Sequence, residues 1–258
     1  MLVRSDDRGT LLIGQPSHAW VSGQLARAWG GQRFGPAQPR EEVCLAAEQH
    51  DIGMAQWDLA PMRNPQTGLP LSFAQMPIGL HLPLWDAAAE RLVRQSRYAA
   101  LLVSMHGMRL YQQRDLDRLE PNEADAVREF LQRQHRLQDQ LLTSLRADPA
   151  TAASAHSELV ARNSDLIWTW DFISLALCLG WAPCSAQAVP TNEGPVELRL
   201  RPGPQRDKVV LDPWPLRPRR LRVRCEGQRL HSVYDSDDDL RRALEAASWE
   251  TLEIELTP

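Results

Sequence analysis

The stretch from Leu166 to Leu179 is apolar almost all the way round a helix, and it constrains the fold more than any other part of the chain. A helix without a polar face is buried on every side, so we expect this stretch to be the second half of a central helix that begins near Ala152. Asp171 lies in its middle, with no lysine or arginine within one turn. Burying an ionised carboxylate without a partner costs several kcal/mol, so a cation must reach Asp171 from elsewhere in the fold.

The composition narrows the classes of protein to which the chain can belong. Apolar residues make up 43% and charged residues 24%, which is typical of a globular protein and argues against disorder. The formal net charge is -4 and Lys208 is the only lysine, so the chain offers no basic field for nucleic acid. The four cysteines have no Cys-x-x-Cys spacing, which predicts reduced, buried thiols.

The sequence shows no signal for export or for membrane insertion. Residues 1–10 are charged and have no apolar secretory core, and no apolar stretch reaches the length of a membrane span. These features predict a cytoplasmic protein that does not act at a membrane.

Helical patterns dominate residues 1–183. Apolar positions recur every three or four residues in several segments, so we expect a mainly α fold over this part of the chain. A stretch rich in proline and glycine interrupts the pattern over residues 54–83, and we expect it to pack as a lid or a pocket wall. The expected helices cover residues 16–30, 39–53, 84–95, 96–113, 121–146 and 152–179.

Short β-prone runs lie at both ends of the chain. Residues 1–14 predict a hairpin, because two such runs flank a cluster of turn-forming residues. Beyond residue 183 we expect a small β or α+β module over residues 184–258, and the hairpin could dock on its sheet. The expected strands cover residues 196–200, 209–211, 221–225 and 252–256, and a helix is expected over residues 237–247.

Four histidines and two aspartates lie on apolar helix faces or at the edge of the irregular segment. For any one of the histidines, a core residue that donates to a backbone carbonyl is an alternative, and a solvated loop histidine is an alternative for His81. Taken together with the unpartnered Asp171, the set predicts a metal site of imidazole and carboxylate ligands. The predicted ligands are His18, His50, Asp51, His81, His106 and Asp171.

In this order the set resembles the HD-domain superfamily of metal-dependent phosphohydrolases, and residues 50–53, His-Asp-Ile-Gly, are similar to its signature. With Gln-Pro-Ser-His at 15–18 and Ser-Met-His-Gly at 104–107, the chain more narrowly resembles a bacterial group of HD-like proteins. The resemblance covers residues 16–180 and implies an HD-type helical bundle. It implies that Asp51 bridges two metal ions, and that His81 and His106 stand where the dinuclear branches have two further histidines.

The resemblance implies a metal-dependent phosphohydrolase or phosphodiesterase. Its imidazole and carboxylate ligands suit two divalent transition-metal ions, with Fe or Mn expected first and Co, Ni or Zn as alternatives. Such ions activate a water for attack on a phosphoester and clamp the phosphoryl oxygens. We expect a small anionic substrate, with Asp51 and Arg109 as the catalytic residues, and Arg109 holding the anionic group. A surface salt bridge is the alternative role of Arg109.

Two other functions stay open at this point. The dinuclear oxygenase branch of the superfamily uses the same four histidines and two aspartates, which implies a mixed-valent diiron oxygenase as an alternative. Many members of the superfamily have a lysine directly after the His-Asp-x-Gly run, where this chain has Met54. That departure puts nucleotide-type substrates in doubt and, with the appended β-module, motivates a non-catalytic metal-binding scaffold as the other alternative.

Overall fold

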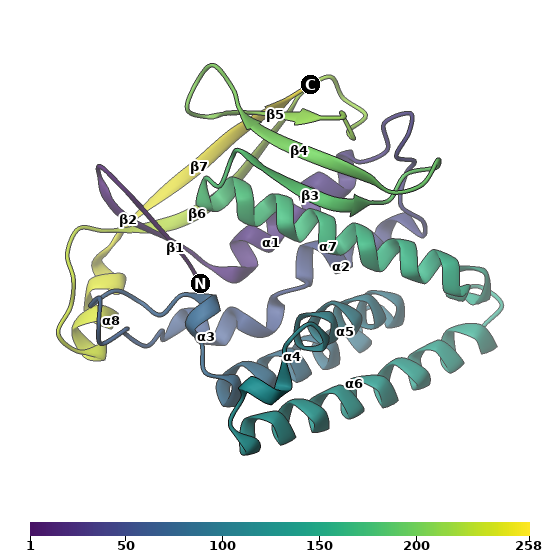
Figure 1. Ribbon diagram of the computed structural model, residues 1–258, viewed down its shortest axis with the longest axis horizontal. Coiled ribbons are helices and arrows are strands. Elements are labelled where there is room, and N and C mark those ends of the chain that lie inside the picture. Colours follow the sequence, from purple (N-terminus) through teal and green to yellow (C-terminus); the bar gives the residue numbers. More distant parts are fainter.

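The computed structural model describes residues 1–258 as a curved sheet that covers two long helices, with the other large helices beyond them (Figure 1). The two helices under the sheet are α1 and α7, and they also contact each other. On the side away from the sheet, α1 contacts α2, and α7 contacts α5. The site described below lies where these four helices meet. The large helices are α1 (Gln15–Ala28), α2 (Arg40–Gln49), α4 (Ile78–Val93), α5 (Arg97–Gln112), α6 (Pro121–Ala147) and α7 (Ser157–Leu179).

Shorter helices connect these elements. They are α3 (Ala55–Leu59), α8 (Asp237–Ala246) and the 3-10 turns η1 (Ile52–Met54), η2 (Phe73–Gln75), η3 (Leu116–Arg118) and η4 (Ala152–Ala155).

A single seven-stranded sheet joins the two ends of the chain. Its order is β1-β2-β6-β7-β5-β4-β3, and all neighbouring pairs are antiparallel except β5 and β7. The N-terminal hairpin pairs with β6, since Ile13 of β2 lies opposite Gly227. The strands are β1 (Leu2–Asp6), β2 (Gly9–Ile13), β3 (Cys184–Val189), β4 (Val196–Pro202), β5 (Lys208–Asp212), β6 (Leu221–Leu230) and β7 (Ser248–Thr257).

This sheet makes the predicted fold class wrong. We expected a mainly α, HD-type bundle with a small appended module, whereas the chain has an α+β fold in which a seven-stranded mixed sheet forms a half-barrel. The strands themselves are close to the predicted ones, but β6 and β7 are each ten residues long and β3 was not expected. The fold class was wrong because the pairing of the strands was not predicted. Hydrophobic alternation indicates that a segment is a strand, but it does not indicate which distant strands it pairs with.

One hydrophobic core serves both the helices and the sheet. A cluster of 50 buried residues includes Leu25 of α1, Ile173 of α7 and Leu198 of β4. The boundary drawn at residues 183 and 184 therefore does not separate two cores. A second cluster of five buried residues lies under α8 and contains Met1, Leu12, Leu230, Leu240 and Leu244.

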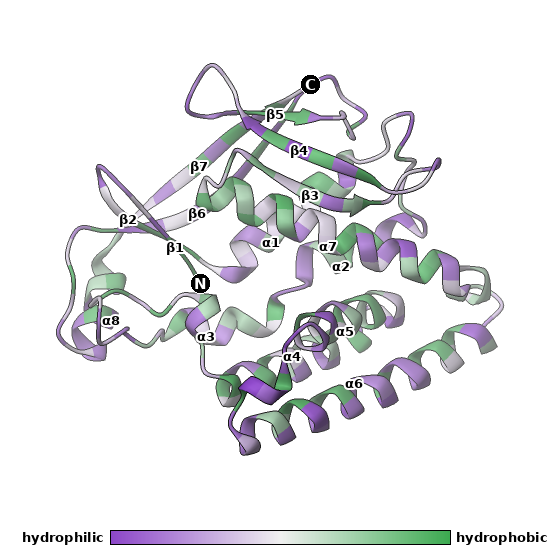
Figure 2. Ribbon diagram, in the orientation of Figure 1, coloured by the Kyte–Doolittle hydropathy of each residue, from purple (hydrophilic) through white to green (hydrophobic).

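The central helix is confirmed as α7. Its side chains at Leu166, Ile167, Trp170 and Ile173 have no exposed surface, and the helix ends where Gly180 adopts the left-handed conformation with φ 70°. That conformation suits glycine, which has no Cβ to clash with the carbonyl oxygen. By contrast, α6 alternates hydrophilic and hydrophobic residues along its length, as an outer helix does (Figure 2).

None of the helices is both long enough and apolar enough to cross a membrane.

Candidate metal centre

The first imidazole of the site comes from α1. His18 lies one turn into this helix and is buried. Its Nδ1 is 2.8 Å from the hydroxyl of Ser174, and that hydroxyl donates its proton to the carbonyl of Asp171 at 2.8 Å. Ser174 can therefore only accept from His18, which places the ring proton of His18 on Nδ1. The Nε2 of His18 faces Asp51 Oδ2, 2.6 Å away.

The second imidazole stands at the C-terminal end of α2. The Nδ1 of His50 lies 2.8 Å from the carbonyl of Ala47, which can only accept, so this nitrogen carries a proton. Its Nε2 lies 3.2 Å from Asp171 Oδ1 and 3.7 Å from Asp51 Oδ2. Burial disfavours the charged ring, but the two carboxylates outweigh burial and raise the pKa of His50 to about 9. The Nε2 positions of His18 and His50 thus converge where positive charge is strongly favoured.

Both carboxylates are surrounded by imidazoles. Every ion-pair partner of Asp51 and of Asp171 is a histidine, and neither carboxylate pairs with a lysine or an arginine. Burial acts to raise the pKa of each carboxyl, but the neighbouring histidines outweigh burial and lower both values. The cation that the sequence requires for Asp171 is therefore not a fixed side-chain charge, because imidazoles are charged only when protonated.

A third imidazole reaches Asp171 from α5. His106 is buried, and its Nε2 lies 3.6 Å from Asp171 Oδ2. Its ring packs between Trp85 and Trp168, with centroids 5.6 Å and 5.5 Å away, and its Nδ1 has no hydrogen-bond partner. Burial among these aromatic rings lowers the pKa of His106 to about 4, so the imidazole is neutral near pH 7.

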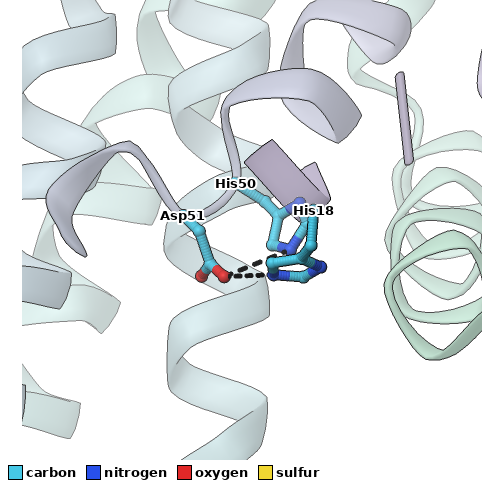
Figure 3. Close-up of side chains that lie close together, drawn as sticks. All are labelled: His18, His50 and Asp51. Atoms are coloured by element: carbon cyan, nitrogen blue, oxygen red, sulfur yellow. Dashed lines mark hydrogen bonds and ion pairs between the residues drawn. The ribbon is translucent and has the colours of Figure 1, made fainter. Parts of the chain in front are cut away.

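Two overlapping groups of side chains could hold a metal ion. One is His18, His50 and Asp51, and the other is His50, His106 and Asp171; within each group the ligand atoms lie within 4.8 Å of one another. Ligand atoms around one transition-metal ion with bonds of about 2.1 Å lie on the order of 3 Å apart. In Figure 3 the carboxylate of Asp51 points at the rings of His18 and His50, and dashed lines mark both contacts. The five residues therefore meet from α1, the end of α2, α5 and α7 with little rearrangement needed.

The structure does not bring His81 into either group. We expected His81 to close an irregular segment, but it lies in the second turn of α4, which begins earlier than predicted and contains Pro83. Both of its ring nitrogens are already engaged: Trp85 Nε1 donates to Nε2 at 3.0 Å, and Nδ1 lies 2.6 Å from Tyr111 Oη. Burial lowers the pKa of His81 to about 4.

Arg109 lies at the edge of the site. Its guanidinium pairs with Asp165 at 2.7 Å and stacks over Trp168 at 4.5 Å from the ring centroid. About one third of its side chain is exposed, at 33%. The salt bridge that we considered as the alternative role of Arg109 is therefore present. The Trp168 ring under the guanidinium also packs against His106.

Glycines allow the histidine-bearing segments to approach one another. A Cβ on Gly53, two residues after Asp51, would lie 1.9 Å from the backbone oxygen of Leu84 in α4. A Cβ on Gly107, next to His106, would lie 2.7 Å from the Trp85 ring. Real Cβ atoms do not come this close, so both positions require glycine.

The sequence did not predict the side chains that form hydrogen bonds with the buried histidines. Ser174 orients His18, and Trp85 and Tyr111 engage His81. The only signal for Ser174 was its place three residues after Asp171, which puts both on one face of a helix. No local pattern predicted the contact between Tyr111 and His81, because these residues lie on different helices.

Comparison with known proteins places the chain in a family. The sequence matches the family described as "Protein of unknown function (DUF3891)" over residues 1–232. The chain belongs to this family. The match to the family runs through the site and on through β6. No curated protein and no solved structure matches the chain.

Proposed function

We propose that this chain is a metal-dependent phosphohydrolase or phosphodiesterase, with a divalent transition metal held by His18, His50, Asp51 and Asp171, and with His106 beside it. The observation that carries the proposal is the convergence of two Nε2 atoms on the carboxylates of Asp51, which is buried, and Asp171, which is 13% exposed. No lysine or arginine neutralises either carboxylate. A divalent cation balances both carboxylates, and neutral imidazole with carboxylate suits Fe, Mn, Co, Ni or Zn, with Fe or Mn the first candidates.

The hydrogen bonds around the ligands support metal binding. Histidines that bind metals donate their other ring N–H to a carbonyl, a carboxylate or another acceptor, which fixes the tautomer. His50 does this through Ala47, and His18 does it through Ser174. A core histidine with a purely structural role needs no such orientation of its second nitrogen toward a buried carboxylate.

The rim of the site supports an anionic substrate. A bound divalent ion would lower the pKa of a water and polarise a phosphoryl oxygen. Arg109, one turn after His106, binds Asp165 through one nitrogen and has further N–H groups for a phosphoryl oxygen. Met54, at the position where many members of the HD-domain superfamily have a lysine, is fully buried, so the phosphate-binding charge has to come from another side chain.

The proposal is tested by turnover. The metal-reconstituted protein is assayed against a panel of phosphomonoesters and phosphodiesters with Mn, Fe, Co and Ni, beginning with p-nitrophenyl phosphate and bis(p-nitrophenyl) phosphate. We expect metal-dependent turnover that His50→Ala and Asp51→Ala abolish. The matched control is His135→Ala, which changes an exposed histidine of α6 and should leave the rate unchanged.

Two results would contradict the proposal. Turnover that persists in both ligand variants would show that the activity lies elsewhere or comes from a contaminant. Stoichiometric metal without turnover of any ester in the panel would instead favour the non-catalytic metal-binding scaffold.

A further inference from the structure

The hydrogen bonds of His81 leave it no lone pair for a metal. Trp85 Nε1–H can only donate, so His81 Nε2 accepts and its ring proton is on Nδ1. That Nδ1–H then donates to Tyr111 Oη at 2.6 Å. A neutral imidazole binds a metal through its unprotonated nitrogen, and in His81 this nitrogen is already occupied.

The two side chains that form hydrogen bonds with His81 are held in place by packing. Trp85 is buried one turn after His81 on α4, and its ring lies against the backbone of Gly107 on α5. Tyr111 is also buried, on the same helix as Gly107, and packs against Phe130 of α6 with ring centroids 5.3 Å apart. Side chains packed in this way cannot turn aside without disturbing the contacts between α4, α5 and α6.

Without His81, a second ion would have only one imidazole of its own. A first ion takes the Nε2 atoms of His18 and His50 together with one oxygen from each carboxylate. His106 is then the only imidazole left, accompanied by the other oxygens of Asp51 and Asp171. Catalytic metal sites usually have at least three protein ligands. Apart from His106, a second ion would have only the carboxylates of Asp51 and Asp171, which already bind the first ion.

We propose that this site holds one metal ion and not two, because Trp85 and Tyr111 keep His81 out of the coordination sphere. This inference rests on the proposed metal-binding function and deepens it. It departs from the dinuclear centre that the resemblance to the HD-domain superfamily implied. It also removes the basis for a mixed-valent diiron oxygenase, since that chemistry needs two irons in one site.

The direct test is the number of ions per chain. Metal-free full-length protein is titrated with Mn(II) and, anaerobically, with Fe(II), and bound metal is counted by elemental analysis after desalting. We expect one ion per chain and the EPR signal of an isolated Mn(II). Two ions per chain, or the multiline signal of a spin-coupled Mn pair, would overturn the inference and leave the proposed hydrolase standing. No bound metal would overturn both.

Variants test the roles of Trp85 and Tyr111. In the double variant Trp85→Phe with Tyr111→Phe, His81 loses both partners, and we expect the metal count to rise from one toward two. The matched control is Trp29→Phe with Tyr98→Phe, which also removes a buried tryptophan N–H and a buried tyrosine hydroxyl and should keep one ion. Circular dichroism establishes that each variant folds, and the wild-type count decides the inference whether or not they do.

A third variant tests whether His81 binds the metal ion or only forms hydrogen bonds with Trp85 and Tyr111. His81→Gln should keep one ion with the wild-type dissociation constant, because His81 does not touch the ion. A count that stays at one in the Trp85 and Tyr111 double variant would contradict the role of these two residues. A loss of metal in a folded His81→Gln protein would contradict the inference as a whole.

Discussion

The buried histidines of the metal centre differ from the buried His81 in what their second ring nitrogen faces. In the metal centre, His18 and His50 donate through Nδ1 to a hydroxyl and a carbonyl, and their Nε2 atoms face carboxylates. By contrast, His81 donates to Tyr111 and accepts from Trp85, so neither ring nitrogen is free to bind a metal. The difference shows that burial alone does not identify a ligand, whereas a complete account of hydrogen bonds can.

The largest effect that this comparison predicts is loss of the metal. Asp171→Asn removes a charge on which three imidazoles converge, and His50→Ala removes the nitrogen shared by both ligand groups. We expect bound metal to fall from stoichiometric to background in each variant. His81→Gln, measured by the same elemental analysis, should keep its metal. Equal losses of metal in all three variants would remove the distinction between His81 and the histidines of the metal centre.

The pH dependence of stability should reveal the neutral state of His81. Its pKa is about 4 in the folded chain, because of burial, against 6.5 in an unfolded one. A depressed pKa contributes stability that is complete above pH 6.5 and is lost as the pH falls toward 4, by up to about 3 kcal/mol. The free energies of unfolding of the wild type and of His81→Gln, measured with urea, should therefore converge as the pH falls through this range. If the two free energies of unfolding instead change in parallel from pH 7 to pH 4, His81 is already charged or exposed.

The close approach beside the His-Asp pair should be sensitive to a single methyl group. Gly53→Ala places a Cβ against the backbone of α4, and overpacking of this kind costs about 1–3 kcal/mol. Gly79→Ala adds the same methyl group on the exposed side of α4, where no atom lies within 4 Å, and should be neutral or slightly stabilising. Denaturant unfolding of the two variants measures the difference. Equal stabilities would mean that η1 does not pack tightly on α4.

The smallest predicted effect concerns the hydroxyl that orients His18. Ser174→Ala removes the acceptor of the His18 Nδ1 proton, and loss of such a partner lowers metal affinity about 10–100-fold. Ser22 donates to Ser174 but forms no hydrogen bond with His18, so Ser22→Ala is the matched control and should change the affinity less. Calorimetric titration with Mn(II) gives both dissociation constants. A weaker affinity in Ser22→Ala than in Ser174→Ala would show that His18 is oriented by another group.

Local patterns predicted the helices well and the fold class badly. The apolar stretch of α7, its end near Gly180 and the positions of α1, α5 and α6 follow from periodicity within each segment. The sheet depends on pairings between residues far apart, such as Ile13 with Gly227, and on the parallel pair of β5 and β7. Such pairings are not encoded in local hydrophobic alternation, so the strands were predicted without the half-barrel that they form.

The candidate site was predicted in the same uneven way. The cost of burying Asp171 indicated that a cation must reach it from elsewhere in the fold. In the structure the groups that approach it are the imidazoles of His18, His50 and His106. The position of His81 in the sequence suggested a ligand, but its two partners come from a turn of its own helix and from another helix. Only the folded chain shows that these partners occupy both nitrogens.

The central claim is that a metal ion lies between the Nε2 atoms of His18 and His50 and the carboxylates of Asp51 and Asp171. Anomalous diffraction from crystals of the full-length protein soaked in Mn(II) tests it most directly. We predict one anomalous peak per chain, about 2.1 Å from both Nε2 atoms and from an oxygen of each carboxylate. A map without a peak at this position, or with a peak bound by His81 instead, would contradict the account.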